Sequence, residues 1–144
     1  MTKKIMVIDD SSEITFSVKF GLEKINSDLN VTRVESGEKF FEMLEKNEIP
    51  DLILLDIMMP KMNGWQVFKK LRKNDKWRNI PVFFLTAKSD NFSKAFGKII
   101  AESYIEKPFE INDLNNRIEK MLIEPYTISE TKAKILDDML EHVQ

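Results

Sequence analysis

The sequence predicts an α/β protein with a doubly wound, five-stranded parallel sheet. Short apolar runs alternate with longer stretches of helical period, and this alternation occurs five times along the 144 residues. Three of the runs, at 5–8, 52–55 and 82–85, are continuously apolar, which is typical of strands that helices cover on both faces. The runs at 31–34 and 104–105 mix polar with apolar residues and are expected to be edge strands.

Amphipathic helices are expected after each strand, because apolar residues recur there at intervals of three and four. The five apolar stripes are Ile14, Val18, Leu22 and Ile25; Phe40, Phe41 and Leu44; Val67, Phe68 and Leu71; Phe92, Phe96, Ile99 and Ile100; and Ile111, Leu114, Ile118, Met121 and Leu122. Most of the phenylalanines, with Phe16 and Phe20 among them, are expected in the core. Five strand–helix units with short connections favour right-handed crossovers and the flavodoxin-like strand order 2-1-3-4-5.

The end of the chain is expected to be a helical extension of this domain. Pro125 is expected to end the fifth helix, and Thr127 followed by Glu130 is typical of a capping box that opens a sixth helix to about residue 143. We therefore expect a domain over residues 1–124 and an extension over residues 125–144. The extension carries an apolar stripe that needs a covering surface, made of Ala133, Leu136, Met139, Leu140 and Val143. Docking onto its own domain is the first expectation, and a homodimer or a partner helix is the alternative.

Composition excludes several kinds of site. The chain has 22 basic and 24 acidic residues, no Cys, and a single His at position 142. This excludes disulfide scaffolds, thiolate metal sites, serine triads and multi-histidine sites, and the near-neutral charge disfavours direct nucleic-acid binding. The apolar runs are too short for a signal peptide or a membrane span, so we expect a cytoplasmic protein without membrane insertion.

A basic cluster lies in and after the third expected helix. It consists of Lys69, Lys70, Arg72, Lys73 and Lys76. Such a cluster is usually a solvated face, and contact with an acidic partner is the alternative. Two tryptophans, Trp65 and Trp77, flank this helix and are expected to cover the sheet.

Candidate catalytic and metal-binding residues follow the expected strands. Ligands bind an open parallel sheet beyond the carboxyl ends of its strands, where the strand order reverses, here between the first and third strands. Asp9 and Asp10 follow the first strand and Asp56 follows the third, while Thr86 ends the fourth and Lys107 follows the fifth. Converging carboxylates repel one another unless a cation neutralises them, and an all-oxygen donor set suits Mg²⁺.

An anion site is expected beside this acidic cluster. The Thr86 hydroxyl, the Ala87 amide and the Lys107 ammonium group together suit a phosphoryl group. A metal site next to an anion site indicates phosphoryl transfer. Because no nucleotide-binding loop accompanies it, the acceptor is expected to be a side chain, and Asp56 is central among the candidates.

These motifs together resemble the receiver domain of two-component response regulators over about residues 3–123. The matching blocks are Asp9-Asp10, the run from Asp56 to Gly64 (DIMMPKMNG), Thr86-Ala87, and the run from Tyr104 to Phe109 (YIEKPF). The resemblance implies that Asp56 accepts a phosphoryl group from a sensor histidine kinase or a histidine phosphotransfer protein. It also implies that Asp10, Asp56 and the backbone carbonyl of Met58 hold Mg²⁺, with Asp9 acting partly through water.

The resemblance also implies how the signal leaves the site. Thr86 and Lys107 would bind the phosphoryl group, and Thr86 with Tyr104 would report it to the face formed by the fourth helix, the fifth strand and the fifth helix. The peptide bond before Pro108 is expected to be cis. In this family the positions of Met58 and Lys88 tune how long the phosphoryl group persists, and a thioether at position 58 predicts a long-lived state, because it cannot orient an attacking water well.

The expected function is that of a single-domain response regulator. About 20 residues remain after position 124, too few for a DNA-binding effector. Such a protein promotes only its own phosphorylation and dephosphorylation and acts through a downstream protein that the sequence does not identify. A dehalogenase-like phosphatase would need a carboxylate where Met58 stands. A receiver-like scaffold that acts without phosphorylation remains the alternative, although the complete acidic set disfavours it.

Overall fold

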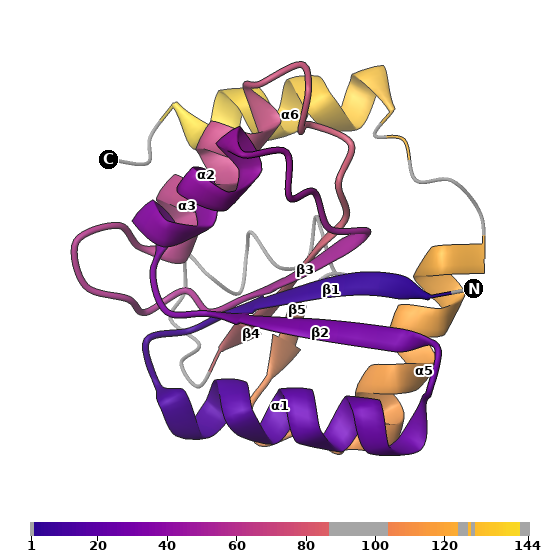
Figure 1. Ribbon diagram of the computed structural model, residues 1–144. Helices are drawn as coiled ribbons and strands as arrows, with labels where there is room; N and C mark the ends of the chain where they lie inside the picture. Colours follow the sequence, from indigo (N-terminus) through magenta and orange to yellow (C-terminus); the bar gives the residue numbers. More distant parts are fainter. Residues whose placement is uncertain (1, 87–103, 124–126, 128, 142–144) are drawn as a thin grey trace.

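A five-stranded parallel sheet forms the centre of the protein. The computed structural model describes residues 2–86, 104–123, 127 and 129–141, without the side chains of Thr86 and Leu140. The strand order is β2-β1-β3-β4-β5, which confirms the predicted topology (Figure 1). The strands are β1 (Lys3–Ile8), β2 (Leu29–Val34), β3 (Leu52–Leu55), β4 (Val82–Thr86) and β5 (Tyr104–Glu106).

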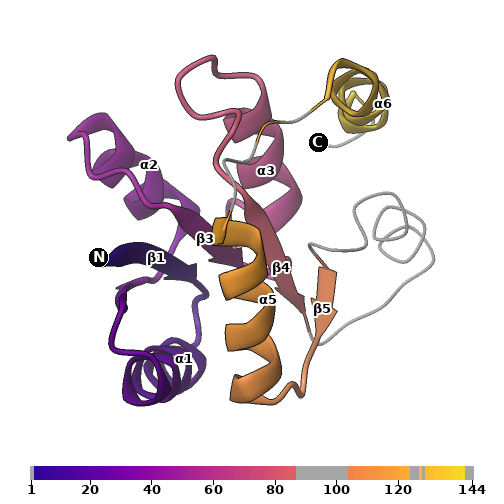
Figure 2. The ribbon, with the colours of Figure 1, turned by 90° about the vertical axis from the view of Figure 1, so that its right-hand side faces the viewer.

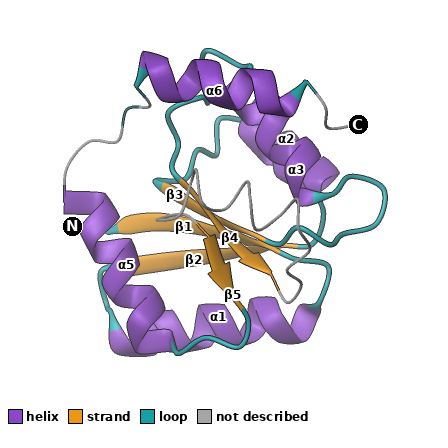
Figure 3. Ribbon diagram, turned by 180° about the vertical axis from the view of Figure 1, so that it is seen from behind, coloured by secondary structure: helices purple, strands orange, loops and turns teal. Residues whose placement is uncertain are grey.

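Helices cover both faces of the sheet, as the continuously apolar central strands require. Helices α1 (Ser12–Ile25) and α5 (Ile111–Ile123) lie on one face, and α2 (Gly37–Glu45) and α3 (Gly64–Arg72) lie on the other (Figure 3). Alternate residues of each strand therefore enter two separate cores. All four residues of β3 are buried, because this strand lies between β1 and β4. The stripe expected for a fourth helix, with Phe92 and Phe96, lies outside the described residues.

Local capping sets where three helices begin. The Ser11 and Ser36 side chains accept hydrogen bonds from the backbone N–H groups of Ile14 and Lys39, which starts α1 and α2. Asn63 forms a capping box with Gln66 at the start of α3, through a side chain-to-backbone hydrogen bond in each direction. These caps end the preceding loops immediately beyond the carboxyl edge of the sheet.

Two phenylalanines of α1 are on the surface, so the prediction that places them in the core is wrong for this pair. Phe16 and Phe20 are 55% and 57% exposed. The buried stripe of α1 passes through Val18 and Leu22, and Phe16 and Phe20 each lie two residues earlier, about 200° around the helix. The two rings stack on each other with their centroids 5.9 Å apart. Ile25, at the end of the same expected stripe, is also exposed.

The C-terminal extension forms helix α6 (Glu130–Leu140), which packs against α3 (Figure 2). Ala133 and Leu136 are buried in the same core as α3, and Met139 packs against that core. The structure therefore agrees with the first expectation, docking of the extension onto its own domain. Thr127 is not the N-cap; the Ser129 side chain accepts from the backbone N–H of Lys132, and the helix begins two residues later than predicted. Pro125, His142 and Val143 lie outside the described residues.

Arg72 is buried, so the prediction of a solvated basic face is wrong for this member of the cluster. Its Nη1 atom donates to the carbonyl oxygens of Arg78 and Ile80, at 2.9 Å each. Its guanidinium group also lies over the ring of Phe68, 4.6 Å from the centroid. Arg72 therefore joins the end of α3 to the turn that leads into β4. Trp65 and Trp77 are buried as expected, at 7% and 4% exposed.

None of the helices in the described ranges is long and apolar enough to cross a membrane.

Replacement of Arg72 by Met is expected to lower the free energy of unfolding by about 2–4 kcal/mol, because the carbonyls of Arg78 and Ile80 lose their charged donor while they remain in the interior. Lys76→Met is the matched control: Lys76 is exposed, and its substitution is expected to change stability by less than about 0.5 kcal/mol. Urea denaturation followed by tryptophan fluorescence measures both. Equal effects of the two substitutions would contradict the structural role of Arg72.

Candidate functional site

Asp9 and Asp56 leave the same edge of the sheet because β1 and β3 are parallel neighbours. Ile8 lies beside Leu55 in the strand register, so the next residue of each strand is an aspartate. The Asp9 N–H donates to the Val34 carbonyl at 3.0 Å, and the Asp56 N–H donates to the Ile8 carbonyl at 2.9 Å. These bonds extend the ladder one residue beyond the strands and hold both backbones in place.

Three carboxylates converge at this edge. One carboxylate oxygen from each of Asp9, Asp10 and Asp56 lies within 4.8 Å of the other two. Asp9 and Asp56 are buried, whereas Asp10 is exposed. The acidic cluster predicted from the sequence is therefore assembled by the fold, with one member open to solvent.

Lys107 supplies positive charge to this cluster from the end of β5. Its Nζ atom donates to Asp9 Oδ2 at 2.8 Å and lies 3.5 Å from Asp56 Oδ1. The other oxygen of Asp9 accepts a hydrogen bond from the backbone N–H of Ser11 at 2.9 Å. Each Asp9 carboxylate oxygen thus accepts one hydrogen bond. Ser11 is not among the site residues predicted from the sequence; its signal there is its position as a suitable N-cap directly after the two aspartates.

Asp56 has an unusual protonation equilibrium. Burial and the nearby negative charge of Asp9 raise its pKa from 3.8 to about 6, and Asp10 adds to the increase. Lys107 opposes the shift but does not cancel it. The charged form of Asp56 is therefore less stable than that of an ordinary aspartate, although it still predominates above about pH 6, and a cation bound among the carboxylates would stabilise it.

The donor set fits a hard divalent cation such as Mg²⁺. Its three carboxylates are oxygen ligands, two of them held in place by the sheet and one free to adjust. All three carboxylates are placed to share one ion, because each Asp9 oxygen that accepts a hydrogen bond keeps a further lone pair. When bound, the ion would neutralise the crowded carboxylates and leave coordination positions for phosphoryl oxygens.

Gly64 allows α3 to begin against the acidic edge. Its N–H donates to the carbonyl of Ile57 at 2.9 Å. A Cβ atom at position 64 would collide with the backbone carbonyl oxygen of Asp56 and lie 2.7 Å from the Cα atom of Ile57. The loop between them projects the Met58 side chain into solvent, 58% exposed. In the sequence Gly64 appears only as the last residue of a motif, and its close approach to the Asp56 backbone becomes evident only in the fold.

The remaining predicted residues lie on β4 and β5. Thr86 pairs with Glu106 in the strand register, and its side chain lies outside the described part of the chain. Tyr104 is half-buried and packs against the core that includes α3. The peptide bond between Lys107 and Pro108 is cis, as expected. Ala87 and Lys88 lie outside the described residues.

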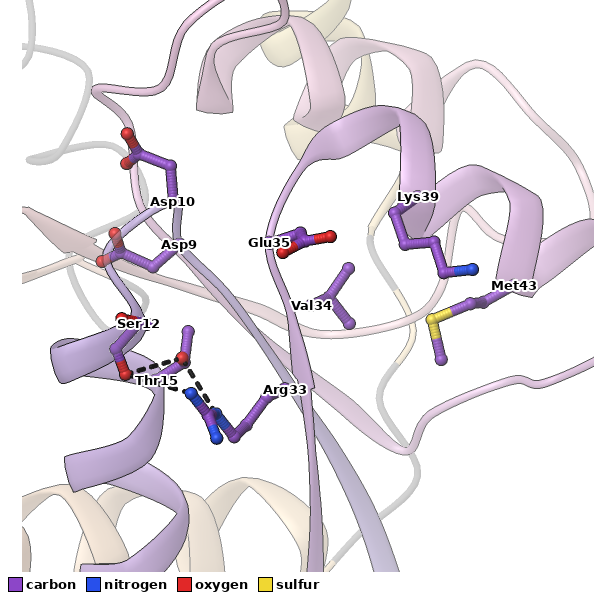
Figure 4. Close-up of a pocket in the computed structure, with 9 residues that line it drawn as sticks. All are labelled: Asp9, Asp10, Ser12, Thr15, Arg33, Val34, Glu35, Lys39 and Met43. Atoms are coloured by element: carbon purple, nitrogen blue, oxygen red, sulfur yellow. Dashed lines mark hydrogen bonds between the residues drawn. The ribbon is translucent and has the colours of Figure 1, made fainter.

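A cavity of about 370 Å³ extends from the acidic cluster toward β2 and α2 (Figure 4). Its lining residues are Asp9, Asp10, Ser12, Thr15, Arg33, Val34, Glu35, Lys39 and Met43. Arg33 is held on one wall by hydrogen bonds to the Thr15 hydroxyl at 3.1 Å and the Ser12 carbonyl at 3.2 Å. The exposed Asp10 therefore lines this cavity as well as the acidic cluster.

The fold and this site define a class: flavodoxin-like α/β proteins with an aspartate–lysine cluster at the carboxyl edge of the sheet. A family profile described as the response regulator receiver domain matches residues 5–119. The chain therefore belongs to the receiver domain family of two-component response regulators, which are signalling domains.

Individual relatives agree with this assignment. The alkaline phosphatase synthesis transcriptional regulatory protein PhoP of Bacillus subtilis is 34% identical over 142 residues, which are 98% of this chain and 57% of that protein. Protein PilG of Pseudomonas aeruginosa is 32% identical over 117 residues, 81% of this chain and 84% of PilG. The structure of the Francisella response regulator 1452 receiver domain has a TM-score of 0.71 at 30% identity, covering 83% of this chain and 96% of that one. The chain spans about half the length of several curated relatives.

Asp56→Asn is expected to stabilise the metal-free protein at pH 7.5 by about 2–3 kcal/mol, because the raised pKa means that ionised Asp56 costs stability. Below the unfolded-state pKa of 3.8 the carboxyl is protonated in both states and the cost is absent; it appears as pH rises and is complete above about 6. Urea denaturation between pH 4 and 8 measures the difference, which should shrink toward pH 4 and when Mg²⁺ is added. A pH-independent difference would show that charge crowding is not its cause.

Proposed function

We propose that this receiver domain accepts a phosphoryl group on Asp56 in a Mg²⁺-dependent reaction, from a sensor histidine kinase or a histidine phosphotransfer protein. The observation that carries the proposal is the position of the Asp56 carboxylate, at the carboxyl end of a central strand, between two further carboxylates and 3.5 Å from the Lys107 ammonium group. Family membership supports the same reaction.

The chemistry follows from the groups present. An Asp56 carboxylate oxygen attacks the phosphorus of the donor phosphohistidine, and an acyl phosphate bond forms while the P–N bond breaks. The bonding electron pair goes to the imidazole nitrogen. Lys107 provides a positive charge for the phosphoryl oxygens, and the Asp9–Lys107 pair at 2.8 Å positions it. The Thr86 hydroxyl is proposed to bind the phosphoryl group as well.

The metal set proposed here is Asp10, Asp56 and the backbone carbonyl of Met58, with Asp9 acting partly through water. Support comes from the convergence of the three carboxylates and from the raised pKa of Asp56, which marks negative charge that needs a cation. The domain would promote only its own phosphorylation and dephosphorylation and would have no separate substrate.

The signal is proposed to leave through Thr86 and Tyr104 toward the face that includes β5 and α5. Tyr104 packs against the core on the α3 side, so its side chain has a defined position that a change at Thr86 could alter. The segment expected to form the fourth helix of this face lies outside the described residues. The target of this face is proposed to be a downstream protein rather than DNA.

The organisation around the domain remains a proposal. We place the receiver over residues 1–124 and the extension over residues 125–144, in a cytoplasmic protein. A single-domain regulator remains a prediction, because several relatives are about twice as long as the matched segment.

Incubation with Mg²⁺ and acetyl phosphate, followed by intact-mass spectrometry, tests the acceptor. Wild type is expected to gain one phosphoryl group, and Asp56→Asn or excess EDTA is expected to abolish the gain. Asp51→Asn is the control, because Asp51 is an exposed acidic residue at the start of β3 that can keep its hydrogen bond to the Lys4 N–H as an amide. An adduct that persists in Asp56→Asn would identify another acceptor. A folded wild type that gains none would favour a scaffold that acts without phosphorylation.

Met58→Asn is expected to shorten the lifetime of the phosphorylated protein several-fold, because the amide can orient an attacking water and the exposed thioether cannot. The decay of the phosphorylated mass after removal of the donor measures the lifetime. Ile123→Asn, the same kind of change at an exposed apolar residue at the end of α5, is the comparison. If the lifetime is unchanged in Met58→Asn, position 58 does not control hydrolysis.

A further inference from the structure

Helix α6 is held on α3 by a narrow contact. Ala133, Leu136 and Met139 follow one another at intervals of three residues along one side of α6; the first two are buried and the third is partly buried. At the far end, the Lys73 ammonium group lies 2.9 Å from a Glu141 carboxylate oxygen, and both side chains are largely exposed. Exposed ion pairs add little to stability, so the apolar residues provide most of the attachment.

The α6 sequence is a poor helix by itself. It has 11 residues, and isolated helices shorter than about 12–15 residues are marginal in water. Three acidic residues, Asp137, Asp138 and Glu141, lie at its carboxyl end, and its last turn has no basic residue. Negative charge at that end opposes the helix macrodipole. Its helical form therefore depends on the surface to which it is docked.

A positive charge lies beside the acidic end of α6. Helix α3 and the turn after it carry the basic cluster, of which Lys69, Lys70, Lys73 and Lys76 are the lysines. Of these lysines, Lys73 pairs with Glu141 of α6, whereas Lys70 is directed toward α2, over the ring of Phe41 at 4.4 Å from its centroid. An acidic amphipathic helix on a basic helix combines apolar burial with complementary charge, and both would recognise any helix of the same pattern.

We propose that the α3 face beneath α6 is a docking surface for an acidic amphipathic helix of a partner protein, and that α6 is its built-in occupant. The partner helix carries two or three apolar residues at intervals of three, and acidic residues near its carboxyl end that face Lys73. It has to displace α6 to bind. This proposal is independent of the chemistry at Asp56.

Helix α6 would compete with a partner helix for the α3 face, and its competition would be of moderate strength. The chain joins α6 to the domain, so its local concentration at α3 is high even though the contact is narrow. A partner helix with a larger apolar face would overcome that advantage. The basic cluster, which the sequence left between a solvated face and a contact for an acidic partner, would then serve the second purpose, with α6 occupying the site until a partner arrives.

Fluorescence anisotropy with two labelled peptides tests the proposal on the full chain. The first peptide is residues 127–144. The second keeps Ala133, Leu136, Met139 and the acidic residues in register and replaces the other positions with Ala and Gln. A charge-reversed form of the second peptide, with Lys at each acidic position, is the control probe.

Leu136→Asp in the full chain displaces α6 and leaves the α3 face intact. Both acidic peptides are expected to bind this variant, and to bind wild type about tenfold more weakly because α6 competes. Lys73→Glu added to Leu136→Asp should weaken binding, and a Glu141→Lys peptide should restore it. Lys24→Glu, the same charge change on α1 across the sheet, should have no effect. Glu141→Lys in the full chain offers a second way to loosen α6 without a change in the core.

Four results would overturn the proposal. Equal binding to wild type and to both loosened variants would show that α6 does not cover the surface. Binding of the first peptide without the second would show that only the native α6 sequence is recognised. Sedimentation velocity tests for dimers of wild type and of Leu136→Asp. If dimers form with increasing concentration and the peptides dissociate them, the occupant of the surface is a second copy of this chain. Loss of binding by the charge-reversed peptide supports the proposal, and its retention contradicts it.

Discussion

Crowding of negative charge at the carboxyl edge of β1 and β3 is the constraint on which this site depends. The parallel register brings Asp9 and Asp56 to one edge, where burial and mutual repulsion raise the pKa of Asp56 to about 6. Lys107 follows β5, whose carboxyl end lies at the same edge of the sheet, and it pairs with Asp9. The two apolar cores hold the strands in register against this repulsion. Binding of a cation, and the change of charge on phosphorylation, would alter this repulsion. A cluster that is destabilising when empty therefore suits a reversible switch.

Helix α3 connects the acidic cluster at Asp56 with the surface on which α6 is docked. It begins at Gly64, whose missing side chain lets the helix approach the Asp56 backbone, and it ends near Lys73, which pairs with α6. Trp65 on α3 also packs on Phe84 of β4, with ring centroids 4.6 Å apart. A rigid helix that contacts the acidic loop at one end and the extension at the other is a direct physical connection between them, through packed side chains.

Several predictions failed because a sequence pattern gives the period of a helix but not the tertiary surroundings of its residues. Phe16 and Phe20 are as apolar as Val18 and Leu22, and only the packing of α1 decides which pair is buried. Arg72 is charged like its lysine neighbours, yet the turn before β4 presents two carbonyls to it and takes it into the interior. Thr127 and Ser129 are both suitable N-caps, and the chain path selects Ser129.

The sequence by itself determined the class of fold, the strand order and the identity of the acidic cluster. Continuous apolar runs and helical stripes have few ways to bury themselves, and right-handed crossovers leave few arrangements for five units, of which the order 2-1-3-4-5 fits three central and two edge strands. The sequence also determined which residues directly follow each strand, because the end of each apolar run marks the end of the strand. Only the tertiary structure decided that Lys107 pairs with Asp9, that Gly64 touches the Asp56 backbone and that α6 docks on α3. Each of these contacts joins segments far apart in the chain or depends on atomic spacing, and neither is encoded in local periodicity.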